Sequence, residues 1–210
     1  MIKNIIFDFG GVIYDIDHTK TKDAFVKLGL KDFDTLYGHA IQSKLFEDFE
    51  IGKISPSDFR EEIRRYISSN ISDNQIDEAW NALLLGFNLK RLDLLEKVNE
   101  QYRIFLLSNT NQIHFLKYMD ELNHMNRLES FKKLFEKLFF SHQIGMRKPD
   151  HKIFYYALSE SHIKPEETVF IDDYDLNIIA ANKCGLKGIH LKPNQNISDL
   201  FDQNGFLIAF

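Results

Sequence analysis

A small set of polar residues at separate places in this chain could carry out chemistry together. Each follows directly on an apolar run or, in the case of one lysine, stands in a short loop before a helical pattern. They are Asp8, Ser108, Asn109, Lys148, Asp172 and Asp173. Carboxylates hold divalent cations and act as nucleophiles, and hydroxyl, amide and ammonium groups bind anions. If the fold brings these residues together, they form a site for a metal ion and an anionic substrate.

The apolar runs before these residues are typical of strands in a parallel sheet. They do not alternate with polar residues, which suits a strand that is buried on both faces. The predicted strands cover residues 5–7, 103–107, 139–140, 168–172 and 188–191. Helical patterns lie between them, and this alternation indicates the α/β class with a doubly wound parallel sheet. Ligands of such sheets bind beyond the carboxyl ends of the strands, where the polar set is expected.

One long helical block interrupts the alternation after the first strand. From about residue 19 to 101 the apolar residues repeat with helical spacing, and no convincing strand is present. The segments Ser55-Pro-Ser-Asp58 and Ser72-Asp-Asn-Gln75 are typical helix starts. The block is too long for a simple crossover, so we expect an all-helical domain inserted into the core. The predicted division is a discontinuous core of residues 1–17 and 88–210 and a cap domain of residues 18–87.

Composition and charge narrow the class of protein. The chain has 210 residues, a formal net charge of −5 and 44% hydrophobic residues, which is typical of a globular protein. The acidic balance argues against a general nucleic-acid binder. A single cysteine, Cys184, excludes an intramolecular disulfide, and no run approaches the roughly 20 apolar residues of a membrane helix. We therefore expect a cytoplasmic protein without nucleic-acid or membrane partners.

The order of the motifs resembles that of the haloacid dehalogenase superfamily. Its strand ending in a nucleophilic Asp matches Ile5-Ile-Phe-Asp8, and its strand ending in Ser or Thr matches Leu106-Leu-Ser108-Asn109. Its lysine motif matches Arg147-Lys148-Pro149, and its acidic motif matches Phe170-Ile-Asp172-Asp173, followed by Asn177. Each motif alone is a weak signal, but the complete set in this order is a strong one. The resemblance covers the whole predicted core.

The helical block also fits the resemblance, because members of the superfamily carry a cap between the first two motifs. The segment Asp8-Phe-Gly-Gly-Val-Ile13 is similar to one branch of the superfamily. That branch contains the bacterial glucose-1-phosphate phosphatases and the N-terminal domains of soluble epoxide hydrolases. Among the aromatic residues of the cap, Tyr37, Phe46 and Phe49 are candidates for facing the cleft and contacting a sugar ring.

The resemblance implies a hydrolase that uses Mg²⁺ and in which Asp8 attacks phosphorus to form an aspartyl-phosphate. The implied metal ligands are Asp8, Asp172, Asp173 and the backbone carbonyl of Gly10. The implied phosphate-binding groups are Ser108, Lys148 and the backbone N–H groups of Asn109 and Gly11. Asn177 would hold Asp172 or Lys148 in place. The histidines are scattered along the chain, so zinc is not expected.

Gly10 departs from the superfamily's phosphatase pattern. In that pattern the position is a second Asp, which protonates the leaving oxygen and later activates water. A general acid contributes about 10²–10⁴-fold to a rate. Its absence predicts efficient turnover only where the leaving group needs little help, as in anomeric sugar phosphates or acyl phosphates. Asp15 and Asp17 could supply a substitute proton, but the sequence does not fix their direction.

Three functions are compatible with the sequence. The favoured one is a Mg²⁺-dependent phosphatase of a small phosphorylated metabolite, with a sugar phosphate as one option. A 2-haloacid dehalogenase would also use Asp8 and needs no second Asp, but Asp172 and Asp173 would repel its carboxylate substrate. A non-catalytic binding or regulatory protein is favoured by Gly10 alone. The substrate, the oligomeric state and the role of the helical stretch at 111–138 cannot be read from the sequence.

Overall fold

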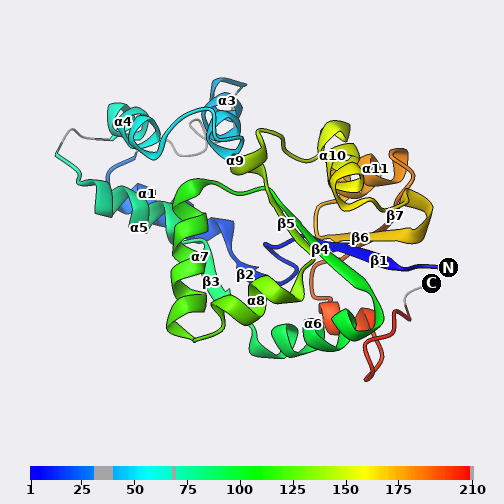
Figure 1. The fold of residues 1–210 in the computed structure, drawn as a ribbon. Helices are drawn as coiled ribbons and strands as arrows, with labels where there is room; N and C mark the ends of the chain where they lie inside the picture. Colours follow the sequence, from blue (N-terminus) through cyan, green and yellow to red (C-terminus); the bar gives the residue numbers. More distant parts are fainter. Residues whose placement is uncertain (31–39, 68–69, 209–210) are drawn as a thin grey trace.

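The computed structural model describes residues 1–30, 40–67 and 70–208. Its centre is a parallel sheet with the strand order β5-β4-β1-β6-β7. The strands are β1 (Asn4–Phe7), β4 (Arg103–Ser108), β5 (Lys137–Phe140), β6 (Thr168–Asp172) and β7 (Lys187–His190). Because all the pairings are parallel, the carboxyl ends of these strands lie at one edge of the sheet (Figure 1).

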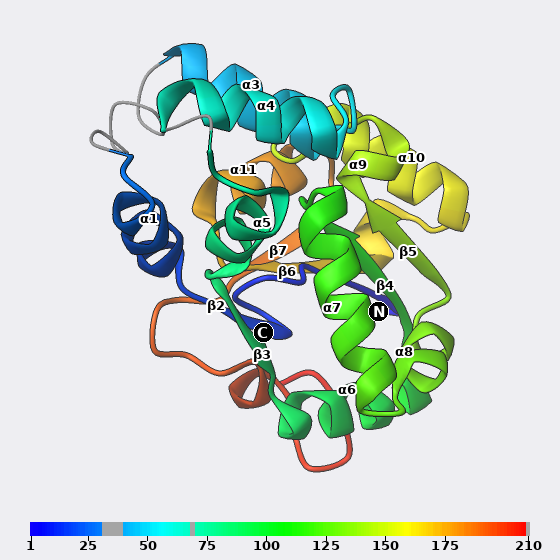
Figure 2. The same ribbon diagram turned by 90° about the vertical axis from the view of Figure 1, so that its left-hand side faces the viewer.

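Helices cover both faces of this sheet (Figure 2). One face carries α6 (Leu89–Gln101), α7 (Gln112–His124), α8 (Leu128–Leu134) and the 3-10 helix η2 (Ile197–Leu200), and the other carries α10 (His151–Ser161) and α11 (Asp175–Lys183). Strand residues alternate between the two cores. In β1, Ile5 and Phe7 pack toward the first face and Ile6 toward the second. The predicted doubly wound α/β fold is therefore confirmed.

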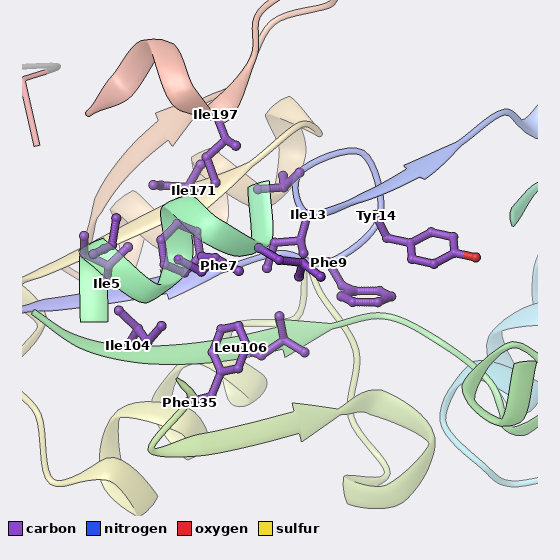
Figure 3. Packing of buried hydrophobic residues seen from close by; sticks show 14 of the residues in the cluster. Ile5, Phe7, Phe9, Ile13, Tyr14, Ile104, Leu106, Phe135, Ile171 and Ile197 are labelled. Atoms are coloured by element: carbon purple, nitrogen blue, oxygen red, sulfur yellow. The ribbon is translucent and has the colours of Figure 1, made fainter. Parts of the chain in front are cut away.

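Aromatic packing fixes the turn that follows β1. Phe9 and Tyr14, which flank this turn, are both buried and stack with their ring centroids 5.3 Å apart (Figure 3). Phe9 also lies 4.6 Å, centroid to centroid, from Tyr118 of α7. Ile13 packs in the same cluster as β1 and β6. These contacts hold the backbone directly after Asp8, at the edge where the polar residues gather.

The helical block lies beyond the carboxyl ends of the strands (Figure 1). Its described helices are α1 (His18–Lys27), α3 (Ala40–Glu50), α4 (Pro56–Tyr66) and α5 (Asp73–Asn81). Ser55 and Ser72 cap α4 and α5 with capping boxes, as the sequence predicts. The block has its own core, in which Phe59 and Trp80 are buried.

Phe46 and Phe49, two of the candidates for facing the cleft, lie in the core of the helical block instead. Phe46 stacks on Trp80 and Phe49 stacks on Phe59, so both rings belong to the core of the helical block. Their helical spacing puts them on the apolar face of α3, which needs a partner inside the block. Tyr37, the third aromatic candidate, lies outside the described residues.

The helical block also contains a strand that the sequence did not predict. β3 (Leu84–Phe87) pairs antiparallel with β2 (Tyr14–Ile16), and this two-stranded ribbon joins the block to the core. The apolar run in β3 is equally compatible with a helix, and its partner is distant in the sequence. Gly86 adopts a φ of +124°, a conformation that other residues rarely take.

Within the stretch from residue 111 to 138, α7 and α8 follow one another, and Lys137 and Leu138 already belong to β5. Most of the two helices belongs to the core. Tyr118, Leu122 and Phe131 pack against the sheet, whereas Ile113 at the start of α7 packs into the helical block. α7 therefore contacts both the core and the helical block. Among the described residues, no helix has the length and apolar composition that a membrane crossing requires.

Candidate active site

The acids predicted for metal binding come together at the carboxyl edge of the sheet. Asp8 follows β1, and Asp172 and Asp173 stand at the end of β6, the neighbouring strand. One carboxylate oxygen from each of the three lies within 4.8 Å of the others. Such a spacing lets a single cation contact all three groups. Hard oxygen donors in this number suit Mg²⁺, which takes carboxylates and keeps several waters.

Lys148 bridges two of these acids. Its Nζ lies 2.7 Å from Asp8 Oδ1 and 2.7 Å from Asp172 Oδ2. The side chain is only 1% exposed, and its ammonium also sits 5.4 Å from the ring centroid of Phe170. A buried ammonium between two carboxylates compensates charge that the interior could not otherwise hold. It also leaves a cation beside the carboxylate that the sequence predicts to be the nucleophile.

Asp172 is held in one orientation by the start of α11. It is completely buried, and its Oδ1 accepts a hydrogen bond from the Tyr174 N–H at 2.8 Å. Asn177 Nδ2 lies 3.0 Å from each carboxylate oxygen of Asp172. The predicted contact between Asn177 and Asp172 is thus present. Asn177 reaches Asp172 because the two residues are separated by the first turn of α11.

The two loops that carry Ser108 and Lys148 are tied to each other. Asn109 Oδ1 accepts from the Lys148 N–H and Asn109 Nδ2 donates to the Lys148 carbonyl oxygen, both at 2.8 Å. Ser108 is buried at the end of β4, next to β1 in the sheet. The Asn109 side chain therefore positions the lysine loop, a role beyond the backbone N–H donor that the resemblance implies.

The pKa values of the charged groups in this cluster are shifted in a way that a bound cation would change. Burial, followed by the nearby charge of Asp172, raises the pKa of Asp8 well above its usual range. Burial alone would lower the pKa of Lys148, but the charges of Asp172 and Asp8 outweigh it and raise this pKa. Asp173 is exposed by surface area, yet desolvation of its carboxylate and the charge of Asp172 raise its pKa. A divalent cation among these acids would favour their charged forms.

The structure does not support Gly11 as a phosphate donor. Its N–H already donates to the carbonyl oxygen of Tyr14 at 2.9 Å, within the turn after β1. Gly11 instead leaves room for the acid beside it. A Cβ at this position would stand 2.1 Å from Asp173 Oδ2, and the φ of +74° favours glycine.

Gly10 faces an apolar side chain. A Cβ built on it would lie 3.2 Å from Ile16 Cδ1, which is tight but not blocked by backbone. The two nearby acids that could replace a missing proton donor have other partners. Asp15 Oδ1 lies 2.7 Å from Arg91 Nη1. Asp17 caps α1, and hydrogen bonds from Thr19 lower the pKa of its carboxyl, which makes it a poor proton donor.

Arg147, which directly precedes Lys148, has no role that could be predicted from the sequence. Its guanidinium reaches out of the core to two acids of α3, Glu47 and Glu50. Neither acid can be connected with Arg147 from sequence, because about a hundred residues separate them and no local pattern links the two segments. The only available signal was the position of Arg147 inside the lysine motif.

Comparisons with known proteins agree with the fold. Residues 2–185 match the family of haloacid dehalogenase-like hydrolases. A D-ribitol-5-phosphate phosphatase from Bacteroides thetaiotaomicron is 35% identical over 187 residues, which cover 89% of this chain and 90% of that protein. A sesquiterpene phosphatase from Aspergillus oryzae is 28% identical over 190 residues, covering 90% of this chain and 89% of that protein.

A solved structure of a related enzyme is also similar. It is a haloacid dehalogenase family enzyme from Bacteroides thetaiotaomicron in complex with magnesium and inorganic phosphate. It superposes with a TM-score of 0.85 at 34% identity, covering 96% of this chain and 100% of that one. With a parallel α/β core, an acid cluster and a family match over most of its length, the chain belongs to the haloacid dehalogenase-like hydrolases.

Proposed function

We propose that this protein is a Mg²⁺-dependent phosphatase that hydrolyses a small phosphorylated metabolite through an aspartyl-phosphate on Asp8. The observation that carries the proposal is the grouping of Asp8, Asp172 and Asp173 within 4.8 Å, beside the buried ammonium of Lys148. Relatives that are phosphatases, and a similar structure that holds magnesium and phosphate, support the same reaction. The proposed substrate class, a small phosphorylated metabolite, is the same as the one expected from the sequence.

The roles of the residues follow from their chemistry. Asp8 attacks phosphorus, and the ester oxygen leaves as the aspartyl-phosphate forms. Ser108 and Lys148 bind the phosphoryl oxygens, and the positive charge of Lys148 stabilises the negative charge that develops there. Asn177 keeps the Asp172 carboxylate turned toward the site. Water then attacks the aspartyl-phosphate, releases inorganic phosphate and restores Asp8.

The metal would be held by the oxygens of Asp8, Asp172 and Asp173, together with the carbonyl of Gly10. When bound, Mg²⁺ neutralises charge so that the Asp8 carboxylate can approach a phosphate dianion. The donor set fits this ion, since three carboxylates of one cluster are within reach of one cation. The positive charge of Lys148, 2.7 Å from Asp8 Oδ1, supports the same approach.

We further infer that residues 18–87 act as a cap over a core of residues 1–17 and 88–210. The described helices of this block have a separate apolar cluster, and they stand beyond the edge that carries the acids. A cap in that place would exclude water during the attack of Asp8 and would select the organic part of the substrate.

The acid pair at the end of β6 argues against the dehalogenase alternative. A 2-haloacid brings its own carboxylate, and it would meet Asp172 and Asp173 close to Asp8. Like charges at such distances oppose binding. A phosphate ester escapes this repulsion because the cation that the acids hold is itself attracted to phosphate.

Release of inorganic phosphate tests the proposal. The panel is hexose 1-phosphates, hexose 6-phosphates, D-ribitol 5-phosphate, acetyl phosphate and p-nitrophenyl phosphate, each with Mg²⁺ and with a chelator. We expect metal-dependent release from at least one ester and no halide release from 2-chloropropionate. Asp8→Asn should lose this release, and Asp175→Asn, at an exposed acid of α11, is its matched control. Halide release without phosphate release would support the dehalogenase instead.

A further inference from the structure

We propose that Arg147 is a positioning residue that latches the end of α3 onto the loop carrying Lys148 and so holds the cap docked on the core. The inference rests on the proposed function, because it assigns the latch to that active site. The latch consists of Arg147 and Ser141 on the core side and of Glu47, Glu50 and Gly52 on the cap side.

The side-chain half of the latch is a forked ion pair. Arg147 Nε donates to Glu50 Oε2 at 2.8 Å, and Arg147 Nη1 donates to Glu47 Oε1 at 3.0 Å. Glu50 is partly buried, with 27% of its side chain exposed. Because most of the Glu50 side chain is shielded from solvent, loss of Arg147 would leave a partly desolvated carboxylate without its counter-charge. The contact joins residues that are about a hundred positions apart in the chain.

The backbone half of the latch uses the same turn of α3. Ser141 Oγ donates to the Glu50 carbonyl oxygen at 2.6 Å and accepts from the Thr110 N–H at 2.9 Å. Gly52 lies so close to α9 (Ser141–Ile144) that a Cβ on it would stand 2.1 Å from the His142 carbonyl oxygen. The backbone after α3 is therefore packed so closely against α9 that there is no space for a side chain at Gly52.

The latch continues directly into the active site. Arg147 and Lys148 are adjacent, so one residue holds the cap while the next places its ammonium 2.7 Å from Asp8. The peptide between them is fixed by Asn109, which bonds both backbone polar groups of Lys148. Ser141 in turn is bonded to Thr110, in the loop after Ser108. The Lys148 loop therefore contacts the end of α3 directly through Arg147, and the Ser108 loop is connected to it through Ser141.

A latch of this kind sets the fraction of molecules in which the cap is docked. If substrate binds productively only to the docked state, the apparent dissociation constant is the intrinsic one divided by the docked fraction. Breaking the latch should then raise KM and leave kcat nearly unchanged, because a saturating substrate restores docking. A defect in the placement of Lys148 would instead lower kcat.

Hydrogen exchange tests the latch without any substrate. In Arg147→Met we expect the amides of residues 47–52 to exchange on the order of tenfold faster than in the wild type. The matched control is Arg60→Met, which removes an equally well-formed Arg–carboxylate pair to Asp77, with both partners inside the cap. The control should leave exchange at residues 47–52 unchanged. Unchanged exchange in Arg147→Met would overturn the proposal.

Kinetics give the second readout. We expect KM to rise about tenfold in Arg147→Met, with kcat within about twofold of the wild type, and a smaller rise in Arg147→Lys. Glu47→Gln should give a smaller rise in KM, because it removes one arm of the fork at a half-exposed side chain of the cap, where a folding defect is not expected. A fall in kcat at constant KM would contradict the latch. If the wild type releases no phosphate, the proposed function fails, and the exchange experiment still decides whether the cap is latched.

Discussion

Lys148 is the residue on which the charge balance of the site depends. Its ammonium is buried between Asp8 and Asp172, at 2.7 Å from each, so the two carboxylates share one cation. The sequence indicates a lysine in this motif but not this contact, because Lys148 lies in a loop whose path is fixed by Asn109. Burial and the charge of Asp172 raise the pKa of Asp8, and the charge of Lys148 opposes this rise by favouring the carboxylate form.

Replacing this lysine should impair both activity and stability. In Lys148→Met we expect phosphate release to fall by about 10²–10³-fold, since one group that stabilises developing charge is lost. The free energy of unfolding in the absence of Mg²⁺ should fall by about 3–5 kcal/mol, because two buried carboxylates lose their cation. Denaturant unfolding and a phosphate assay measure the two effects. Lys192→Met, an exposed lysine near the same edge, is the control, and an equal loss there would refute the assignment.

We expect Gly10 to restrict the leaving groups that the enzyme accepts. Gly10→Asp should raise turnover of hexose 6-phosphate by about 10²–10⁴-fold and change acetyl phosphate turnover little, because only the poor leaving group needs a proton. The new side chain must displace Ile16 Cδ1 slightly, so we expect a modest loss of stability. Gly10→Asn has nearly the same shape without the acid. If Gly10→Asp leaves the poor substrate unchanged, the leaving-group explanation is wrong.

At the scale of the elements, the contact of α5 with α7 joins the cap to the core. His114 of α7 is buried, stacks on Trp80 of α5 at 4.9 Å between centroids, and its Nδ1 lies 2.9 Å from Asn81 Oδ1. Ile113 beside it packs into the cap's own core. The sequence predicted these helices but not their junction, because the junction joins apolar faces that are far apart in the chain.

The buried histidine makes this junction sensitive to acid. Burial lowers the pKa of His114 from its usual 6.5 to about 3, so the unfolded chain takes up this proton more readily than the folded protein. Stability is therefore complete above pH 6.5 and falls by up to about 1.4 kcal/mol per pH unit as the pH drops toward 3. Unfolding curves between pH 7 and about 4.5 measure this slope.

His114→Phe should flatten that slope while keeping a ring against Trp80. His151→Phe, at an exposed histidine of α10, is the matched control and should leave the slope as it is. A slope that is the same in the wild type and in His114→Phe would show that this histidine does not couple folding to protons.

The two-stranded ribbon of β2 and β3 could not be predicted from local sequence patterns. Leu84 and Leu85 fit a helix as well as a strand, and only pairing with β2 decides between them. By contrast, Ser55 and Ser72 start their helices as predicted, because a cap is formed by residues within one turn. Short-range chemistry was therefore readable from the sequence, and contacts between distant segments were not.

For the whole molecule, the alternation of apolar strands with helices was enough to predict the parallel sheet and the edge at which the acids meet. Asp8, Ser108 and Asp172 end neighbouring strands, so a parallel sheet necessarily brings them together. Two contacts could not be predicted: the hydrogen bond from the Gly11 N–H to the Tyr14 carbonyl oxygen, and the ion pair of Arg147 with Glu50. Each depends on the path of a loop, which no sequence pattern indicates.

Mg²⁺ should stabilise the folded protein as a whole. The acid cluster exists only when β1 and β6 are paired, so the ion binds the native state in preference to the unfolded chain. At a concentration of 100 times its Kd, Mg²⁺ should raise the free energy of unfolding by about 2.7 kcal/mol. Thermal unfolding with and without Mg²⁺ measures this gain. Asp173→Asn should reduce it and Asp175→Asn, at an exposed acid nearby, should not; equal gains in both would place the ion elsewhere.

The most direct test of the account is to look for the phosphoryl group on Asp8. The enzyme is mixed with Mg²⁺ and the best ester of the panel, quenched in acid within the first turnover and digested for mass spectrometry. We predict that the peptide containing Asp8 gains the mass of one phosphoryl group, and that Asp8→Asn shows neither this gain nor phosphate release. Phosphate release by Asp8→Asn at the wild-type rate, or a phosphoryl group on another residue, would contradict the central claim.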